Sequence, residues 1–143
     1  AQTLGGYLGE VKPGQRASSH ISPIIVSKDG SPILALGAAG GAKIPSAIVA
    51  VISRVIDQNH SLDKAMALPR VYPQKEGIDL EWTGTDAWSK ADSTYFISMG
   101  HVVSIQRGKG RFGRVHAVQK NSKTGEWIGV ADPDWEGSAG APN

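Results

Sequence analysis

The sequence predicts an α+β fold with a mainly antiparallel sheet, and three observations support this class. Asp29-Gly30 separates two apolar runs, which is a strong short-range signal for a β-hairpin. Apolar residues from Ile44 to Ile56 recur at the spacing of one face of a helix. Two further segments, 113–120 and 126–131, flank a turn-forming stretch and predict a second hairpin. We therefore expect one mixed arrangement of sheet and helices, dominated by antiparallel pairing.

Composition limits the class of protein. The chain has 143 residues, enough for a sizeable core, and we expect a single domain over residues 1–143. Its hydrophobic content of 40% and charged content of 20% are typical of a folded globular protein. The net charge of +2 gives no support for nucleic acid as a partner, and no apolar run is long enough to cross a membrane. Because cysteine is absent, disulfides, thiolate metal sites and a cysteine nucleophile are excluded.

The first predicted strand follows an irregular N-terminal stretch. Glycine is frequent in residues 1–10, and Val11–His20 is a polar loop with a Pro-Gly turn signal. Ile21–Lys28 is predicted as a strand because it contains three contiguous β-branched residues. Pro23 places the start of this strand at the edge of a sheet, since proline cannot donate to a ladder. The return strand of the hairpin is predicted over Pro32–Leu36.

Two helices are predicted after the first hairpin. The longer one covers Ile44–Asn59, with Pro45 near the first helical position, where the missing N–H costs nothing. Ser61 is the expected N-cap of a shorter helix that continues to Leu68 and is ended by Pro69.

The second half of the chain is less regular. The alternation over Ile78–Trp82 predicts a short strand, and Asp86–Met99 is predicted as a helix that is capped by Asp86 and ended by Gly100. His101–Gln106 is expected to be a strand. The tail from Asp132 onward is rich in Gly, Ala and Pro, and we expect it to run over the surface.

The stretch Gly37–Ile44 carries the strongest functional signal. It lies in the predicted turn between a strand and the longer helix, where backbone N–H groups lack partners and the positive end of the helix dipole is exposed. A carboxylate or a developing oxyanion would be stabilised there. The simpler interpretation is a tight turn that only requires positive φ. The stretch fails as a P-loop because Ala42 and Ile44 replace the required Gly and Ser or Thr.

A second glycine-rich stretch, Gly108–Gly113, has dinucleotide-type spacing but is followed by an alternating, strand-like segment instead of a helix. The cations in and beside this stretch are an alternative contact for an anionic polymer, although a solvated loop is the simpler interpretation. These cations are Arg107, Lys109, Arg111 and Arg114. The four histidines show no metal-ligand spacing, so no metal site is predicted. Asp132-Pro133-Asp134 is expected to be a solvated turn.

Several motifs in their order along the chain resemble the gamma-glutamyltransferase family, specifically the C-terminal part of its small subunit. The family pattern contains P-x-K-R-P-L-S-S-M-S-P-T-I-V, then a D-G-x-P turn, then G-S-P-G-G-S-R-I. The corresponding blocks here are Pro13–Val26, Asp29–Pro32, Gly37–Ile44, Val55–Asp57, Ala65–Arg70, Met99–Val103 and Ala131–Pro133.

This resemblance implies a fragment of the αββα sandwich of an N-terminal nucleophile hydrolase, which acts on glutathione-like gamma-glutamyl amides without a cofactor. Ser18 and Ser19 correspond to the adjacent serines that hold the substrate carboxylate. Gly40 and Gly41 correspond to the paired glycines whose N–H groups form the oxyanion hole. The nucleophilic Thr is expected on a companion segment, because this chain begins at Ala1, and a large subunit is the further partner. A periplasmic or secreted location is favoured by the family.

The chain also departs from the family pattern. His20 follows the serine pair in place of Met, and Ala38-Ala39 and Ala42-Lys43 replace Ser-Pro and Ser-Arg around the glycines. Asp134 stands where the family has Arg after Asp-Pro. These differences leave open a related acylase with a different acyl group, and a noncatalytic domain that binds an anionic partner is the other alternative.

Overall fold

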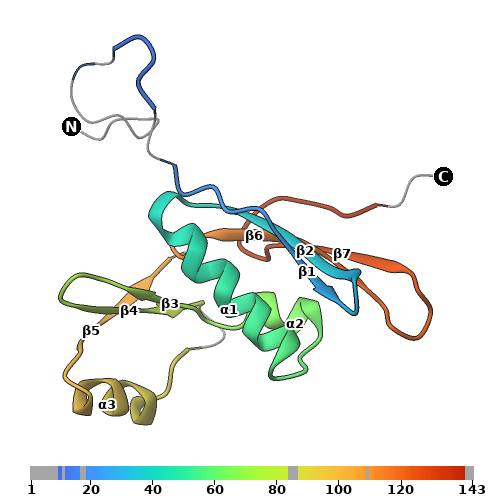
Figure 1. Cartoon of the computed structure of the whole chain (residues 1–143). Helices are drawn as coiled ribbons and strands as arrows, with labels where there is room; N and C mark the ends of the chain where they lie inside the picture. The colour runs from blue at the N-terminus through green and yellow to red at the C-terminus, as the bar shows by residue number, and fades with distance from the viewer. Residues whose placement is uncertain (1–9, 11, 17–18, 84–86, 109, 141–143) are drawn as a thin grey trace.

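The structure is a computed structural model that describes residues 10, 12–16, 19–83, 87–108 and 110–140. In this part of the chain, two sheets and three α-helices follow one another in mixed order (Figure 1). The elements are β1 (Ile24–Lys28), β2 (Ser31–Ala39), the 3-10 turn η1 (Gly41–Lys43), α1 (Ile44–Ile56), α2 (Leu62–Ala67), β3 (Val71–Pro73), β4 (Gly77–Trp82), α3 (Lys90–Ser98), β5 (Val102–Arg107), β6 (Arg114–Lys120) and β7 (Trp127–Ala131).

The larger sheet has the strand order β1-β2-β6-β7, and every pairing in it is antiparallel. Both predicted hairpins are confirmed. Asp29 and Gly30 have φ of 50° and 76°, the positive values that a two-residue turn between twisted strands favours. As Pro23 indicated, β1 is an edge strand.

The smaller sheet has the order β3-β4-β5 and combines an antiparallel with a parallel pair. The strands β4 and β5 are parallel, and α3 lies between them in the chain as the crossover that parallel strands require. The strand β3 was not predicted, because it has three residues and ends in Pro73. The antiparallel pairs still outnumber the parallel one, so the predicted pairing class is confirmed among the described ladders.

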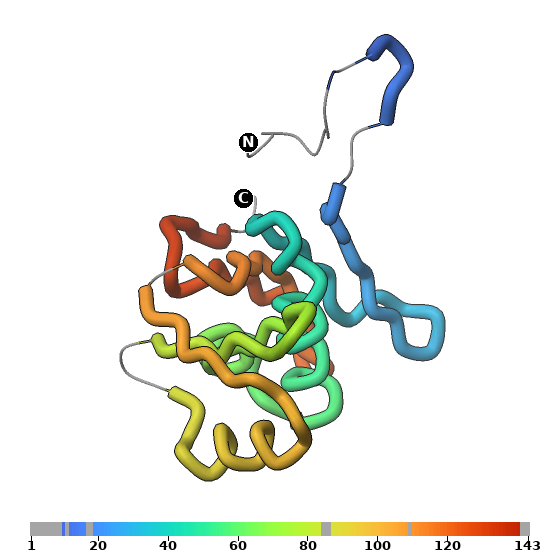
Figure 2. The backbone as a smooth tube through the Cα atoms, turned by 90° about the vertical axis from the view of Figure 1, so that its left-hand side faces the viewer, coloured from blue at the N-terminus to red at the C-terminus, as the bar shows by residue number. Residues whose placement is uncertain are grey.

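The helix α1 connects the two sheets. It packs against β2 and β6 of the larger sheet and β3 of the smaller one, and α2 covers its C-terminal half (Figures 1 and 2). The core formed between these elements consists of buried aliphatic side chains. They are Leu34, Leu36, Ile44, Ala47, Ile48, Val51, Val55, Leu62, Ala65, Met66, Val115 and Ala117. The apolar face that the sequence predicted for this helix is therefore its buried face.

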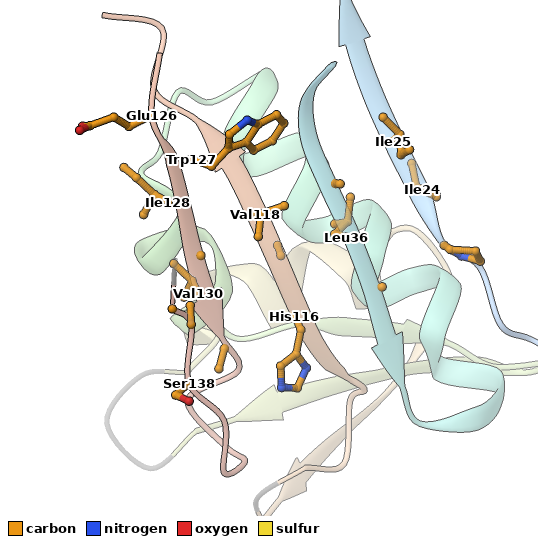
Figure 3. Close-up of a pocket in the computed structure, with 18 residues that line it drawn as sticks. Ile24, Ile25, Leu36, His116, Val118, Glu126, Trp127, Ile128, Val130 and Ser138 are labelled. Atoms are coloured by element: carbon orange, nitrogen blue, oxygen red, sulfur yellow. The ribbon is translucent and has the colours of Figure 1, made fainter. Parts of the chain in front are cut away.

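The opposite face of the larger sheet is covered only in part, where Gly137 and Ala139 of the C-terminal tail pack against β6 and β7. Outside this contact the face is open. Leu36 pairs with Ala117 on the helix-covered side, so the alternate pair Ala35 and Val118 faces away from α1. Figure 3 shows this face, where Val118 and Trp127 line a groove and remain 42% and 47% exposed. A sheet with an exposed apolar face indicates a missing layer.

Four predicted boundaries were wrong by three or more residues. β1 begins at Ile24 rather than Ile21. α1 ends at Ile56 rather than Asn59, which has φ of 55° and cannot continue the helix. α3 begins at Lys90, because Ser89 forms a capping box with Asp92; the predicted cap, Asp86, lies outside the described residues. The strand β2 extends to Ala39, since six of its residues pair with β6, so Gly37 is in a strand and not in the turn.

Candidate active site

The glycine loop, residues 40–43, connects β2 to α1. Gly40 has φ of 136° and Gly41 has φ of 61°, values that residues with a Cβ rarely adopt. Both residues are exposed, and Pro45 lies in the first turn of α1, as predicted. The simple requirement for positive φ is therefore met, and the functional interpretation depends on the backbone donors.

The backbone donors of the glycine loop are available to a ligand. In the described part of the chain, neither the N–H of Gly40 nor that of Gly41 donates to a protein acceptor. The carbonyls of these two residues point the other way along the chain, since they accept from Lys43 N at 3.3 Å and from Ile44 N. Two adjacent free donors at the start of a 13-residue helix form a site for an anion or an oxyanion.

The predicted carboxylate site is described only in part. Ser18 lies outside the described residues. Ser19 is exposed, and its Oγ accepts from Ile21 N at 3.2 Å, which forms a local turn. The register that pairs Ile24 with Leu36 would place His20 opposite Gly40 if it continued toward the N-terminus, although the ladder begins only at Ile24. Ser19 and the glycine loop thus belong to the same end of the first hairpin.

The sequence interpretation missed a buried ion pair. Arg70 Nη2 donates to Asp132 Oδ2 at 2.8 Å, and the two side chains are 3% and 1% exposed. The prediction that Asp132 belongs to a solvated turn was therefore wrong. Asp132 also accepts from Val115 N at 2.9 Å, and Arg70 Nη1 donates to the carbonyl of Gly113 at 2.7 Å. The only signal in the sequence was that Arg70 and Asp132 lie in two of the blocks that carry the family resemblance.

Two more charged side chains are buried beside this pair. Arg54 of α1 donates to the carbonyls of Ala65, Leu68 and Pro69, so it connects α1 to the end of α2. Burial, followed by the neighbouring Arg70 charge, lowers the pKa of Arg54. Glu81 accepts from Arg70 N at 2.8 Å, and its burial raises the pKa of its carboxyl above the usual range. These contacts bind the two sheets together around Arg70.

The second glycine-rich stretch is not a simple solvated loop. Phe112 is 1% exposed, and Gly113 is buried as well. Arg107 lies 4.5 Å from the ring centroid of Trp82, and Arg114 lies 3.7 Å from that of Trp135. Two of the four cations are thus paired with aromatic rings of the chain, while Lys109 lies outside the described residues.

The described ranges contain no group of three His, Asp or Glu side chains that could hold a metal ion. None of the described helices is long and apolar enough to cross a bilayer.

The chain is similar to known proteins over most of its length. A glutathione hydrolase proenzyme of Bacillus subtilis (strain 168) is 29% identical over 136 residues, which are 95% of this chain and 22% of that protein. An acylase ACY 1 proenzyme of Pseudomonas sp. (strain SE83) is 33% identical over 94 residues, 65% of this chain and 16% of that protein. The structure of gamma-glutamyltranspeptidase from Pseudomonas nitroreducens complexed with L-DON has a TM-score of 0.76 at 29% identity and covers 96% of this chain and 72% of its own.

The chain thus spans about a fifth of the length of its Bacillus subtilis relative. The structural neighbours confirm the expected fold class, α+β with mainly antiparallel sheets and N-terminal nucleophile hydrolase-like, of which the described elements form a fragment. The family model described as gamma-glutamyltranspeptidase matches residues 7–141. The chain therefore belongs to the gamma-glutamyltranspeptidase family.

Proposed function

We propose that this chain forms part of the active site of a gamma-glutamyl transferase or hydrolase. In this proposal, Gly40 and Gly41 supply the oxyanion hole through their N–H groups, and Ser18 and Ser19 hold the substrate carboxylate. The single observation that carries the proposal is the pair of free donors at the start of α1, in a chain of which residues 7–141 match the family.

The reaction proceeds in two steps, and the nucleophile is a Thr on a companion segment. The Thr hydroxyl attacks the gamma-carbonyl carbon of the substrate, while the amine of the same Thr takes the hydroxyl proton. The negative charge that develops on the carbonyl oxygen is stabilised by the N–H groups of Gly40 and Gly41. The C–N bond of the substrate then breaks, and the substrate's amine leaves with the proton that the Thr amine returns to it. A water molecule or an acceptor amine next gives a proton to the Thr amine and attacks the acyl ester, which releases the gamma-glutamyl group and restores the Thr hydroxyl.

The serine pair fixes the other end of the substrate. Each hydroxyl supplies one directed donor, and two adjacent donors match the two oxygens of a carboxylate. Ser19 Oγ accepts a hydrogen bond from Ile21 N, and among the described residues its O–H has no acceptor, so this group can donate to a carboxylate. The carboxylate of a gamma-glutamyl amide is several bonds away from its gamma-carbonyl, so the two sites are separate parts of one pocket.

The open face of the larger sheet is the contact surface for the rest of the protein. Ile25, Val118 and Trp127 expose apolar area on this face, and α1 covers the opposite one (Figure 3). The relatives contain a long stretch of chain that has no counterpart here. We propose that the segment bearing the Thr forms a second sheet over this face, which would complete the sandwich.

A related amide acylase is the second candidate. One observation favours it: an acylase proenzyme is among the relatives, at 33% identity over 94 residues. Ala38 and Ala39 precede the glycine loop where the family pattern has Ser-Pro, so the side chains next to the loop are smaller and less polar than in that pattern. Parallel assays with a gamma-glutamyl anilide and with an aliphatic acyl anilide distinguish the two candidates.

The test uses the full-length protein and gamma-glutamyl-p-nitroanilide. Gly41→Pro removes one oxyanion donor and should lower kcat by about two to three powers of ten. Ser18→Ala should mainly raise KM. Gly125→Pro is the matched control, because Gly125 also has positive φ (79°) but lies in an exposed turn between β6 and β7. If Gly41→Pro changes KM alone, or leaves kcat unchanged, the oxyanion role is wrong.

A further inference from the structure

The loop before β6 has no role in the proposed chemistry, yet it contacts the glycine loop directly. We name residues 110–113 the backing loop. Its last residue, Gly113, has φ of 88° and is buried. A Cβ added to Gly40 would lie 2.8 Å from the Cα of Gly113, a distance that real Cβ atoms essentially never show. The backbones of these two glycines are therefore in contact.

Gly113 also contacts the residues on both sides of the glycine loop. A Cβ added to Gly113 would lie 2.9 Å from the Cβ of Ala47, 3.4 Å from the carbonyl oxygen of Lys43 and 3.6 Å from that of Ala39. Ala39 precedes the loop, Lys43 ends it, and Ala47 is in the second turn of α1. One glycine thus fixes how closely β2 and α1 approach β6.

A second contact holds the end of the glycine loop. Lys43 Nζ lies 4.8 Å from the ring centroid of Phe112 and 5.1 Å from that of Tyr72. A cation at these distances is attracted by both rings. Because Phe112 is fully buried beside Gly113, this contact is a second one between the glycine loop and the backing loop.

The backing loop is itself held by hydrogen bonds that are buried near Gly113 and partly buried at Gly110. Arg70 donates to the carbonyl of Gly113, and Asp132, paired with Arg70, accepts from Val115 N. Asp134 Oδ2 accepts from Gly110 N at 3.1 Å at the other end of the loop. The surface against which Gly40 packs is therefore fixed by hydrogen bonds at three points.

We propose that the backing loop positions the oxyanion hole, with Gly113 and Lys43 as positioning residues. Neither residue is assigned contact with the reacting atoms. Gly113 sets the distance between Gly40 and the start of β6, and Lys43 holds the end of the glycine loop against Phe112. This inference rests on the proposed function, because it concerns the position and direction of the N–H groups of Gly40 and Gly41.

The test measures kcat and KM of the full-length protein with gamma-glutamyl-p-nitroanilide. Gly113→Ala should lower kcat by about tenfold or more while KM stays within about twofold, since a small misplacement of catalytic groups slows the chemical step. Adding Ala47→Gly to Gly113→Ala removes the methyl group that the new Cβ meets, and it should restore part of the lost kcat. Gly125→Ala is the control, because Gly125 has a similar positive φ of 79° and a Cβ added there would meet nothing within 4 Å.

A second pair of variants keeps the test decisive if Gly113→Ala does not fold. Lys43→Met removes the charge over the rings and should lower kcat, while Lys43→Arg keeps the charge and should retain kcat. Wild-type kcat in Gly113→Ala, a folded double variant without recovery, or wild-type kcat in Lys43→Met would each overturn the inference. The proposed function fails separately: in that case Gly41→Pro itself would retain kcat.

Discussion

Gly40→Ala and Gly41→Ala add one methyl group at neighbouring positions, and the structure predicts unequal losses. At Gly41 the added Cβ would meet nothing within 4 Å, and φ of 61° is the left-handed value that other residues occasionally adopt. At Gly40 φ is 136°, and the added Cβ would lie 2.8 Å from the Cα of Gly113. The first change thus strains the backbone only, whereas the second also creates a backbone collision.

The magnitude follows from these contacts. Alanine in the left-handed region costs roughly 1–2 kcal/mol, which is the whole expected penalty for Gly41→Ala. For Gly40→Ala, the contact is 0.6 Å shorter than the 3.4 Å at which ordinary van der Waals contact begins, and Gly113 cannot yield because Arg70 holds its carbonyl. Overpacking of this kind adds about 1–3 kcal/mol unless the glycine loop itself moves.

The same collision should also slow catalysis. A shift of the Gly40 donor should lower kcat by more than about tenfold, and by about 10²-fold if the shift reaches about 1 Å, because transition-state contacts depend steeply on position. Gly41→Ala leaves its N–H in place and should lower kcat less than about tenfold. The assay is anilide hydrolysis by the full-length protein, with thermal melting of each variant as the check on folding. Equal losses of kcat in both folded variants, or a larger loss in Gly41→Ala, would refute this reasoning.

Three further predictions concern the substrate, the buried ion pair and pH. Ser19→Ala should raise KM by about tenfold or more, because it removes a hydrogen bond to a charged group of the substrate. Ser22→Ala is the control and should leave KM unchanged, because the Ser22 hydroxyl donates to the His20 carbonyl. The KM values of the two variants test this prediction. Asp132→Asn should cost about 3–5 kcal/mol of stability, because it leaves the buried Arg70 without its charged partner. Denaturant titration measures this loss, with Asp134→Asn as the control. Equal stability of the two variants would contradict the prediction. Burial raises the folded-state pKa of Glu81, so the folded protein binds more protons than the unfolded chain above about pH 4.3, and stability falls as pH rises through the folded pKa. Glu81→Gln should remove this fall, which melting temperatures across pH 4–8 would show as a smaller slope than in the wild type.

Local patterns predicted most of the elements. The Asp29-Gly30 turn, the apolar stripe of α1 and the position of Pro45 each depend on residues that are close in sequence, so one sequence is enough to find them. β3 could not be found this way. Its three residues contain no periodicity, and it exists because β4 offers a free edge beside it.

In the candidate site, too, the features that depend on neighbouring residues were predicted and the long-range contacts were not. The glycine loop was found because glycines between a strand and a helix form a local signal, and its free donors follow from the geometry of any helix start. The Arg70–Asp132 pair joins residues that are 62 positions apart, and nothing near Asp132 marks it as buried. The contact between Gly40 and Gly113 is equally remote in sequence. These long-range contacts needed the fold, although the ordered family blocks already contained Arg70 and Asp132.

The most direct measurement of the central proposal is a crystal structure of the full-length protein with a boronic acid that mimics the gamma-glutamyl group. Such a compound forms a tetrahedral adduct with the nucleophilic hydroxyl and carries an oxygen at the position of the oxyanion. We predict that this oxygen lies about 2.7–3.1 Å from the nitrogens of Gly40 and Gly41, with the carboxylate on Ser18 and Ser19. An adduct whose oxygen is bound by other donors, with the glycine loop unoccupied, would contradict the proposal.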